Sequence, residues 1–182
     1  MDKVTYNGLT FEPYLTRDEI ALQVKRVAEE IRRDYGNANP MFLCVLKGAA
    51  IFAVDLFREC GIKDSEITFI RFKSYSGTST TGAAKQIMGL DEEIEGRTVI
   101  VVEDIVDTGI TAQQLMEDLA KKNPKEVKIA SLLFKPDSLQ TGVRPDYIGF
   151  SIPPKFIIGY GLDIDGQARN LQDIYVICED KK

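Results

Sequence analysis

Two short runs of apolar residues constrain the fold of this chain more than any other feature of the sequence. Met41 to Leu46 is apolar at every position, and Thr98 to Val102 is the most β-branched segment. A strand that is apolar throughout is buried on both faces, as happens in parallel sheets that are covered by helices on both sides. The two runs therefore predict an α/β fold, with 98–102 as a central strand.

Helical patterns alternate with the predicted strands. Thr16-Arg17-Asp18-Glu19 reads as a capping box, and apolar residues recur behind it at helical spacing until Gly36. Residues 49–60 are apolar nearly all round and predict a buried helix that ends at Gly61. The remaining predicted elements are strands at 67–73, 127–134 and 147–152, a helix through Ala112 and Leu119, and apolar runs at 156–158 and 174–178. This alternation predicts a mostly parallel central sheet flanked by helices.

Composition excludes several classes of protein. The 182 residues predict a single domain, and none of them is histidine, so Ser-His-Asp and Cys-His triads and His-ligated zinc are excluded. A net charge of −5 argues against a nucleic-acid partner, and no apolar run approaches the length that spans a bilayer. The three cysteines are far apart in the sequence, which favours a reducing cytoplasm over a disulfide framework.

The chemistry is predicted at the carboxyl ends of the strands, because ligands bind there in open parallel sheets. Four segments lie at such ends: 47–48, the hydroxyl-rich 74–82, 103–111, and Lys135 with its neighbours. The third is the most informative, since an acidic pair leads into a Gly/Thr turn and then a helix. Such a turn directs backbone N–H groups at one point, and the hydroxyls of Thr108 and Thr111 add to this phosphate cradle.

Three carboxylates before a phosphate cradle need a further reason. They suit a ligand that also has hydroxyls and a reaction centre that becomes positive, because carboxylates accept hydrogen bonds from a diol and stabilise such a centre. Asp104 and Asp107 also have a simpler interpretation as loop and helix-cap acids. The complete string from Val99 to Thr111 favours the functional interpretation.

This string resembles the phosphoribosyl-pyrophosphate motif of type I phosphoribosyltransferases. From about Leu43 to Ile177 the chain resembles their hypoxanthine-guanine branch, through four further motifs in the same order. These are Leu46-Lys47-Gly48, Lys73-Ser74-Tyr75 with Ser79-Thr80-Thr81-Gly82, Ser131 to Lys135, and Phe156 to Asp163. The resemblance implies the type I phosphoribosyltransferase fold, with a core at about 37–150 and a small hood from about 1–15 and 151–182.

The resemblance also implies a reaction and a site. A 6-oxopurine, hypoxanthine or guanine, and phosphoribosyl pyrophosphate would give the nucleoside monophosphate and pyrophosphate, with Mg2+ as the cofactor. The implied catalytic acid/base is Asp107. The implied phosphoribosyl-pyrophosphate residues are Lys47, Gly48, Glu103, Asp104, Asp107, Thr108, Gly109, Ile110, Thr111 and Arg169. The implied purine residues are Lys135, Phe156, Ile157 and Asp163, the implied lid is Ser74 and Tyr75, and the implied magnesium ligands are Asp163, Glu103 and Asp104. A cis peptide is implied between Leu46 and Lys47.

Two segments depart from the family pattern, and two other functions remain open. Residues 165–168 lack the aromatic residues common in the family, which puts Arg169 in doubt, and Ile110 stands where relatives often carry a polar residue. One alternative function is a regulator that senses the ligand without catalysis. The other is a transferase of the same fold for adenine, xanthine or a pyrimidine. The apolar helix at 49–60 and the resemblance favour a homodimer or homotetramer.

Overall fold

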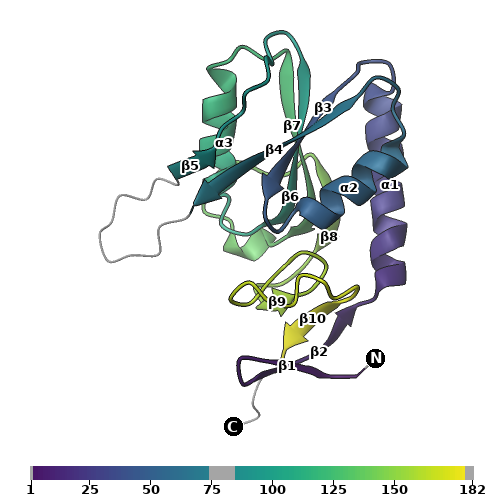
Figure 1. Ribbon diagram of the computed structural model, residues 1–182, viewed down its shortest axis with the longest axis vertical. Coiled ribbons are helices and arrows are strands. Elements are labelled where there is room, and N and C mark those ends of the chain that lie inside the picture. The colour runs from purple at the N-terminus through teal and green to yellow at the C-terminus, as the bar shows by residue number, and fades with distance from the viewer. Residues whose placement is uncertain (1, 74–84, 179–182) are drawn as a thin grey trace.

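The computed structural model describes residues 2–73 and 85–178 and contains a six-stranded sheet at its centre (Figure 1). Its strands are β3 (Met41–Leu46), β4 (Glu66–Lys73), β5 (Lys85–Met88), β6 (Thr98–Val106), β7 (Glu126–Phe134) and β8 (Tyr147–Ser151). They follow the order β5-β4-β3-β6-β7-β8. Every neighbouring pair is parallel except β4 and β5, which are antiparallel. The predicted α/β fold with a mostly parallel sheet is confirmed.

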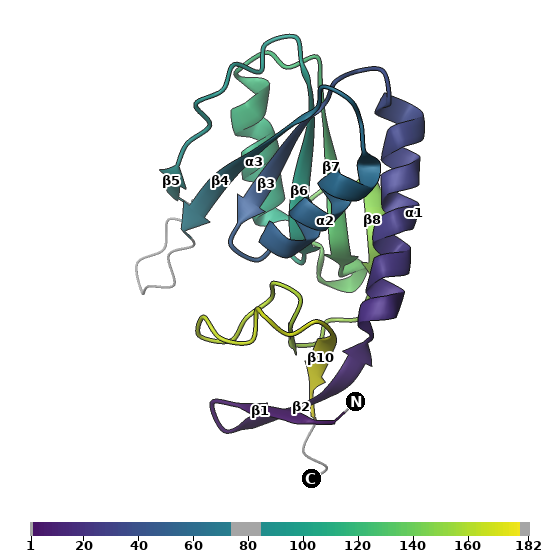
Figure 2. The ribbon, with the colours of Figure 1, turned by 45° about the vertical axis from the view of Figure 1, so that its right-hand side comes forward.

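Three helices cover the two faces of this sheet. Helices α1 (Arg17–Tyr35) and α2 (Ala50–Cys60) lie on one face, and α3 (Ile110–Ala120) lies on the other (Figure 2). Helix α1 begins at the predicted capping box, in which the Thr16 amide donates to Glu19 Oε2 over 2.8 Å. Helix α2 ends at Gly61 as predicted, and Gly61 adopts a left-handed conformation with φ 55°, as is common at helix C-termini.

The core consists of one apolar cluster on each face of the sheet. The first joins α1 and α2 to alternate residues of the strands, such as Phe42 and Ile100. The second joins α3 to the residues between them, such as Leu43 and Val101. Successive side chains of a strand point to opposite faces, so an apolar residue at every position of β3 serves both clusters. This explains why the apolar runs at 41–46 and 98–102 are continuous.

A second, antiparallel sheet of four strands joins the two ends of the chain. Its order is β1 (Val4–Tyr6), β2 (Leu9–Leu15), β10 (Ile174–Ile177) and β9 (Ile157–Ile158). It lies beyond the carboxyl ends of the parallel strands (Figures 1 and 2). This four-stranded sheet is the hood that the sequence predicts from its two terminal segments. The exact division into core and hood stays a prediction.

One boundary was predicted wrongly. The sequence predicts a central strand at 98–102, but β6 continues to Val106. It does so because Glu103 and Val106 remain paired with Ser131 and Phe134 of β7. Glu103 and Asp104 therefore lie within the hydrogen-bonded part of β6 rather than in a loop, and this pairing limits how far their backbone can move. No helix in the described residues is long and apolar enough to cross a membrane.

Candidate active site

The turn between β6 and α3 surrounds a small cavity. The cavity has a volume of about 200 Å³, and it is lined by Glu103, Asp104, Ile105, Val106, Thr108, Gly109, Thr111 and Ala112. Five of these eight residues are predicted site residues. Because α3 begins at Ile110, the cavity lies at the N-terminal end of this helix, where unpaired N–H groups favour an anion.

Gly109 makes this turn possible. Its φ of 80° is unfavourable for other residues, and a Cβ there would lie 2.4 Å from Thr141 Oγ1 and 2.8 Å from Leu139 Cδ1. The segment that supplies these two side chains also pairs with the turn, since the Gln140 amide donates to the Thr108 carbonyl over 2.9 Å. Sequence reasoning missed the segment 139–141 because no local pattern marks a residue that supports a distant turn.

Glu103 at the end of β6 is buried, Asp104 beside it is partly buried, and both carry shifted pKa values. Burial raises the pKa of Glu103 well above its usual range, and the neighbouring Asp104 raises it further. Burial likewise raises the pKa of Asp104 to about 6, although a hydrogen bond from the Ile105 amide to its carboxylate acts in the opposite direction and lowers this pKa. Burial therefore favours the protonated form of both carboxylates.

The turn that follows β3 packs directly on this pair. A Cβ on Gly48 would lie 1.5 Å from Asp104 Oδ2, so only glycine leaves room for the carboxylate. The Leu46–Lys47 peptide bond is cis, as the resemblance implied. The structure thus brings Lys47 and Gly48 together with Asp104 across neighbouring strands β3 and β6.

Asp107 and Lys135 form an ion pair beside the cavity. Lys135 follows β7 and precedes the short 3₁₀ helix Pro136–Ser138, and its Nζ donates to Asp107 Oδ2 over 2.9 Å. Its side chain is 10% exposed, whereas that of Asp107 is 45% exposed. The backbone also holds the two segments together, since the Lys135 amide donates to the Val106 carbonyl. A buried ammonium group and an exposed carboxylate therefore face the same space.

Asp163 and Arg169 pair on the far side of the site. Arg169 Nη1 donates to the Gly161 carbonyl over 2.6 Å, and Arg169 Nη2 forms a salt bridge with Asp163 Oδ1 at 2.5 Å. The Gly166 amide donates to the other carboxylate oxygen of Asp163 over 2.7 Å. The charges of Arg169 and Asp163 both affect the pKa of Asp104, so the pair lies near the acidic end of β6.

Phe156 and Ile157 come from the smaller sheet. Phe156 is 47% exposed, and its ring centroid lies 6.0 Å from that of Phe11, which is fully buried. Ile157 is buried and pairs with Val176. The predicted purine residues therefore come from segments next to both sheets. The buried ring of Phe11 packs against the exposed ring of Phe156. The sequence did not single out Phe11, because a lone phenylalanine in a terminal strand carries no signal.

Two predictions about this site, the lid and the magnesium ligands, stay predictions. Ser74 and Tyr75, the predicted lid, lie outside the described residues. Within residues 2–73 and 85–178, no three acidic or cysteine side chains come close enough to hold a metal ion by themselves. A magnesium ion here would therefore need oxygen atoms from a ligand or from water.

Comparisons with known proteins place this arrangement in a class. Residues 12–165 match the family model described as "Phosphoribosyl transferase domain". The chain is 36% identical to the hypoxanthine-guanine phosphoribosyltransferase of Mycobacterium bovis over 93% of its own length and 87% of the relative's. It is 40% identical to the rat enzyme of the same name, over 88% of the chain and 78% of the relative.

Solved structures agree with the sequence comparison. A hypoxanthine-guanine phosphoribosyltransferase from Bacillus anthracis has a TM-score of 0.86 at 37% identity, covering 92% of this chain and 98% of that one. A hypoxanthine phosphoribosyltransferase from Staphylococcus aureus has a TM-score of 0.87 at 32% identity, covering 92% and 91%. The fold and the site thus define a type I phosphoribosyltransferase. Within that class, the chain belongs to the hypoxanthine-guanine phosphoribosyltransferase family.

Proposed function

We propose that this protein is a purine salvage enzyme. It converts hypoxanthine or guanine, with phosphoribosyl pyrophosphate, to IMP or GMP and pyrophosphate. The observation that carries this proposal is the pair formed by Lys135 and Asp107, whose Nζ and Oδ2 lie 2.9 Å apart beside a phosphate-sized cavity. One member donates hydrogen bonds only, and the other exchanges protons, which is the combination that a 6-oxopurine needs.

Recognition of the base follows from the chemistry of the side chains. Lys135 donates to the 6-oxygen of the purine and leaves the 6-amino group of adenine without a partner. The exposed ring of Phe156 stacks on the flat base, with Phe11 packed behind it. The Ile157 carbonyl faces the exocyclic 2-position. The base is thereby held between the smaller sheet and the end of β7.

The sugar phosphate is bound by the turn before α3 and by the acidic pair. The backbone amides of 108–111 and the hydroxyls of Thr108 and Thr111 hold the 5′-phosphate at the helix N-terminus. Glu103 and Asp104 accept hydrogen bonds from the ribose hydroxyls. Lys47, Gly48 and Arg169 bind the pyrophosphate group.

The carboxylates also fit a magnesium ion. Asp163 lies close enough to raise the pKa of Asp104, and two such carboxylates suit a hard divalent cation that takes its other ligands from phosphate and water. Asp163, Glu103 and Asp104 would hold the ion. When bound, it neutralises charge on the leaving pyrophosphate.

Glycosyl transfer needs one bond broken and one formed at C1 of the ribose. The purine nitrogen attacks C1 while the bond to pyrophosphate breaks, and the sugar passes through a positively charged state. Asp107 takes or returns the proton at the purine N7, and its negative charge opposes the positive charge on the sugar. Ser74 and Tyr75 would close over the site and exclude water, which would otherwise capture C1.

The two alternative functions are separated by one assay. Purified protein is mixed with phosphoribosyl pyrophosphate, magnesium and each of hypoxanthine, guanine, xanthine and adenine, and the reaction is followed by ultraviolet absorbance. Turnover of hypoxanthine and guanine supports the salvage enzyme, and turnover of adenine alone supports the other transferase. Binding of phosphoribosyl pyrophosphate without turnover of any base supports the regulator.

Assembly and location belong to the same proposal. A homodimer or homotetramer in the cytoplasm is expected, with no nucleic acid or membrane as a partner. On α2, Phe52, Ala53 and Leu56 pack inward while Val54 stays 42% exposed, so this helix retains apolar surface. Light scattering coupled to size-exclusion chromatography measures the number of subunits directly, and a monomer at micromolar concentration would contradict the expectation.

A further inference from the structure

Tyr160 connects the segment after β9 to helix α2. Its hydroxyl donates to Asp55 Oδ2 over 2.6 Å, and only 8% of the residue is exposed. The two residues are 105 positions apart in the sequence. Neither has a part in the proposed mechanism, so this partly buried hydrogen bond to a carboxylate needs a separate explanation.

The backbone around Tyr160 is held in an unusual conformation. Gly159, Tyr160 and Gly161 have φ values of 101°, 47° and 99°, so three residues in succession lie in the left-handed region. A bulky residue such as tyrosine adopts this region only where its surroundings fix it. The Tyr160 amide donates to the Leu171 carbonyl over 2.9 Å, so the residue is held by both its backbone and its hydroxyl.

The next residue touches the turn that follows β3. A Cβ on Gly161 would lie 2.1 Å from the carbonyl oxygen of Gly48, so the two backbones are in direct contact. Gly48 stands immediately before the N-terminal end of α2, the helix that carries Asp55. These contacts therefore form a closed ring. It runs from Gly48 along α2 to Asp55, across the hydrogen bond to Tyr160, and through Gly161 back to Gly48.

This ring holds the segment that carries Asp163 and Arg169. Arg169 donates to the Gly161 carbonyl and pairs with Asp163, so both residues take their position from the same turn. Gly48 in turn packs on Asp104. The hydrogen bond between Tyr160 and Asp55 is thus connected through Gly161 and Gly48 to Arg169, Asp163 and Asp104. Lys135 and Asp107 are not part of this ring.

We propose that Asp55 and Tyr160 are positioning residues for the pyrophosphate half of the site. Their hydrogen bond keeps the Gly161 turn against Gly48, so that Asp163, Arg169 and the Lys47–Gly48 turn face one ligand. The inference rests on the proposed function. Loss of the hydrogen bond weakens phosphoribosyl pyrophosphate binding and leaves recognition of the purine base unchanged.

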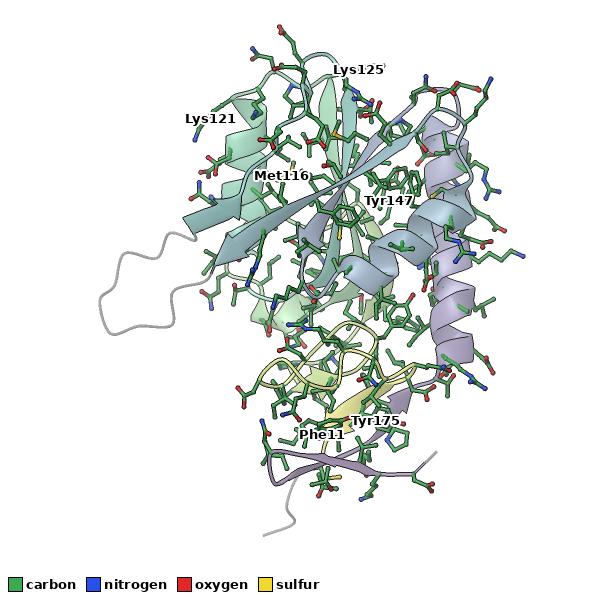
Figure 3. The ribbon with its side chains drawn as sticks, in the orientation of Figure 1. Phe11, Met116, Lys121, Lys125, Tyr147 and Tyr175 are labelled. Carbon is green, nitrogen blue, oxygen red and sulfur yellow. The ribbon has the colours of Figure 1, made fainter. Side chains whose placement is uncertain are left out.

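The test compares Tyr160→Phe and Asp55→Ala with two controls. Asp55→Asn keeps a side-chain oxygen that accepts the hydrogen bond from the Tyr160 hydroxyl. Tyr147→Phe removes a similar, partly buried hydrogen bond, which the Tyr147 hydroxyl donates to Asp34 Oδ2 over 2.9 Å. Tyr147 belongs to the six-stranded sheet and lies away from the smaller sheet, which contains Phe11 and Tyr175 (Figure 3). Calorimetric titration with phosphoribosyl pyrophosphate in excess magnesium gives Kd, steady-state kinetics give KM for each substrate, and thermal unfolding gives Tm.

The expected result is specific to one substrate. Tyr160→Phe and Asp55→Ala raise Kd and KM for phosphoribosyl pyrophosphate about tenfold, the factor typical of a lost hydrogen bond to a charged group. KM for hypoxanthine stays within about twofold, Asp55→Asn restores most of the affinity, and Tyr147→Phe lowers Tm without changing Kd. A wild-type protein that neither binds phosphoribosyl pyrophosphate nor turns over hypoxanthine contradicts the proposed function. An active wild type with an unchanged Kd in Tyr160→Phe, an equal loss in Tyr147→Phe, or no recovery in Asp55→Asn overturns the positioning role.

Discussion

The Nζ atom of Lys135 lies 2.9 Å from Oδ2 of Asp107, and this ion pair connects the ends of the neighbouring strands β6 and β7. The ammonium group and the carboxylate neutralise each other in this pair. A 6-oxopurine offers an acceptor to Lys135 and a ring nitrogen to Asp107, so its binding replaces one contact with two. In the proposed function the pair therefore serves as a preformed template for the base.

Replacement of Asp107 separates binding from chemistry. Asp107→Ala is expected to lower kcat by about 10² to 10⁴, the usual contribution of a positioned acid/base, while Kd for phosphoribosyl pyrophosphate is largely kept. Single-turnover kinetics and calorimetry measure the two quantities. Asp137→Ala, in the nearby 3₁₀ helix, serves as a control for the loss of a carboxylate. Turnover near the wild-type rate in Asp107→Ala would remove Asp107 from the mechanism.

Replacement of Lys135 affects the base alone. Lys135→Gln keeps a donor but shortens the side chain and removes the charge, so KM for hypoxanthine and guanine is expected to rise about 10- to 100-fold. Kd for phosphoribosyl pyrophosphate remains close to that of the wild type. The exposed Lys121, which pairs with Asp118, supplies the control Lys121→Gln, for which no kinetic change is expected. Equal losses for both substrates in Lys135→Gln would contradict this assignment.

Gly48 tests the contact beneath the acidic pair. Gly48→Ala places a Cβ 1.5 Å from Asp104 Oδ2, so either the turn or the carboxylate must move. We expect a loss of at least about tenfold in phosphoribosyl pyrophosphate affinity, because both residues serve that ligand. Gly142→Ala is the matched control, since a Cβ there meets nothing within 4 Å. Equal affinities in the two variants would show that the contact is not needed.

The raised pKa of Asp104 predicts how binding depends on pH. Burial raises this pKa to about 6, so protonation below that pH removes the charge that attracts a cation. Affinity for magnesium phosphoribosyl pyrophosphate is therefore expected to fall as the pH drops from 7 to 5. The phosphates of the ligand also titrate in this range, and Asp104→Asn separates the two effects. If the variant showed the same pH dependence as the wild type, Asp104 would not be its source.

The same shift predicts how stability depends on pH. An acid whose pKa is higher in the folded than in the unfolded state favours folding at low pH, and this contribution is lost as the pH rises through the folded value. For Asp104 the loss between pH 5.5 and 8 is about 1 kcal/mol. Urea unfolding of the wild type and Asp104→Asn at both pH values measures it. The variant is expected to gain stability over the wild type by that amount, and an unchanged difference would contradict the shift.

Local patterns predicted most of the helices and strands of the larger sheet, and they failed where distant segments meet. The capping box at Thr16 and the end of α2 at Gly61 are determined within one turn of chain, and both were predicted. The end of β6 was predicted wrongly because pairing with β7 extends it. Likewise, the contact of Gly161 with Gly48 depends on how the two sheets pack, and no spacing in the sequence encodes it.

The most direct test of the account is the formation of nucleotide from a matched pair of bases. Purified protein is incubated with magnesium, phosphoribosyl pyrophosphate and either hypoxanthine or adenine, and nucleotide and pyrophosphate are quantified by chromatography. The account predicts IMP and pyrophosphate in equal amounts from hypoxanthine and no AMP from adenine, because Lys135 offers adenine only donors. No nucleotide from hypoxanthine, or AMP formed as fast as IMP, would contradict it.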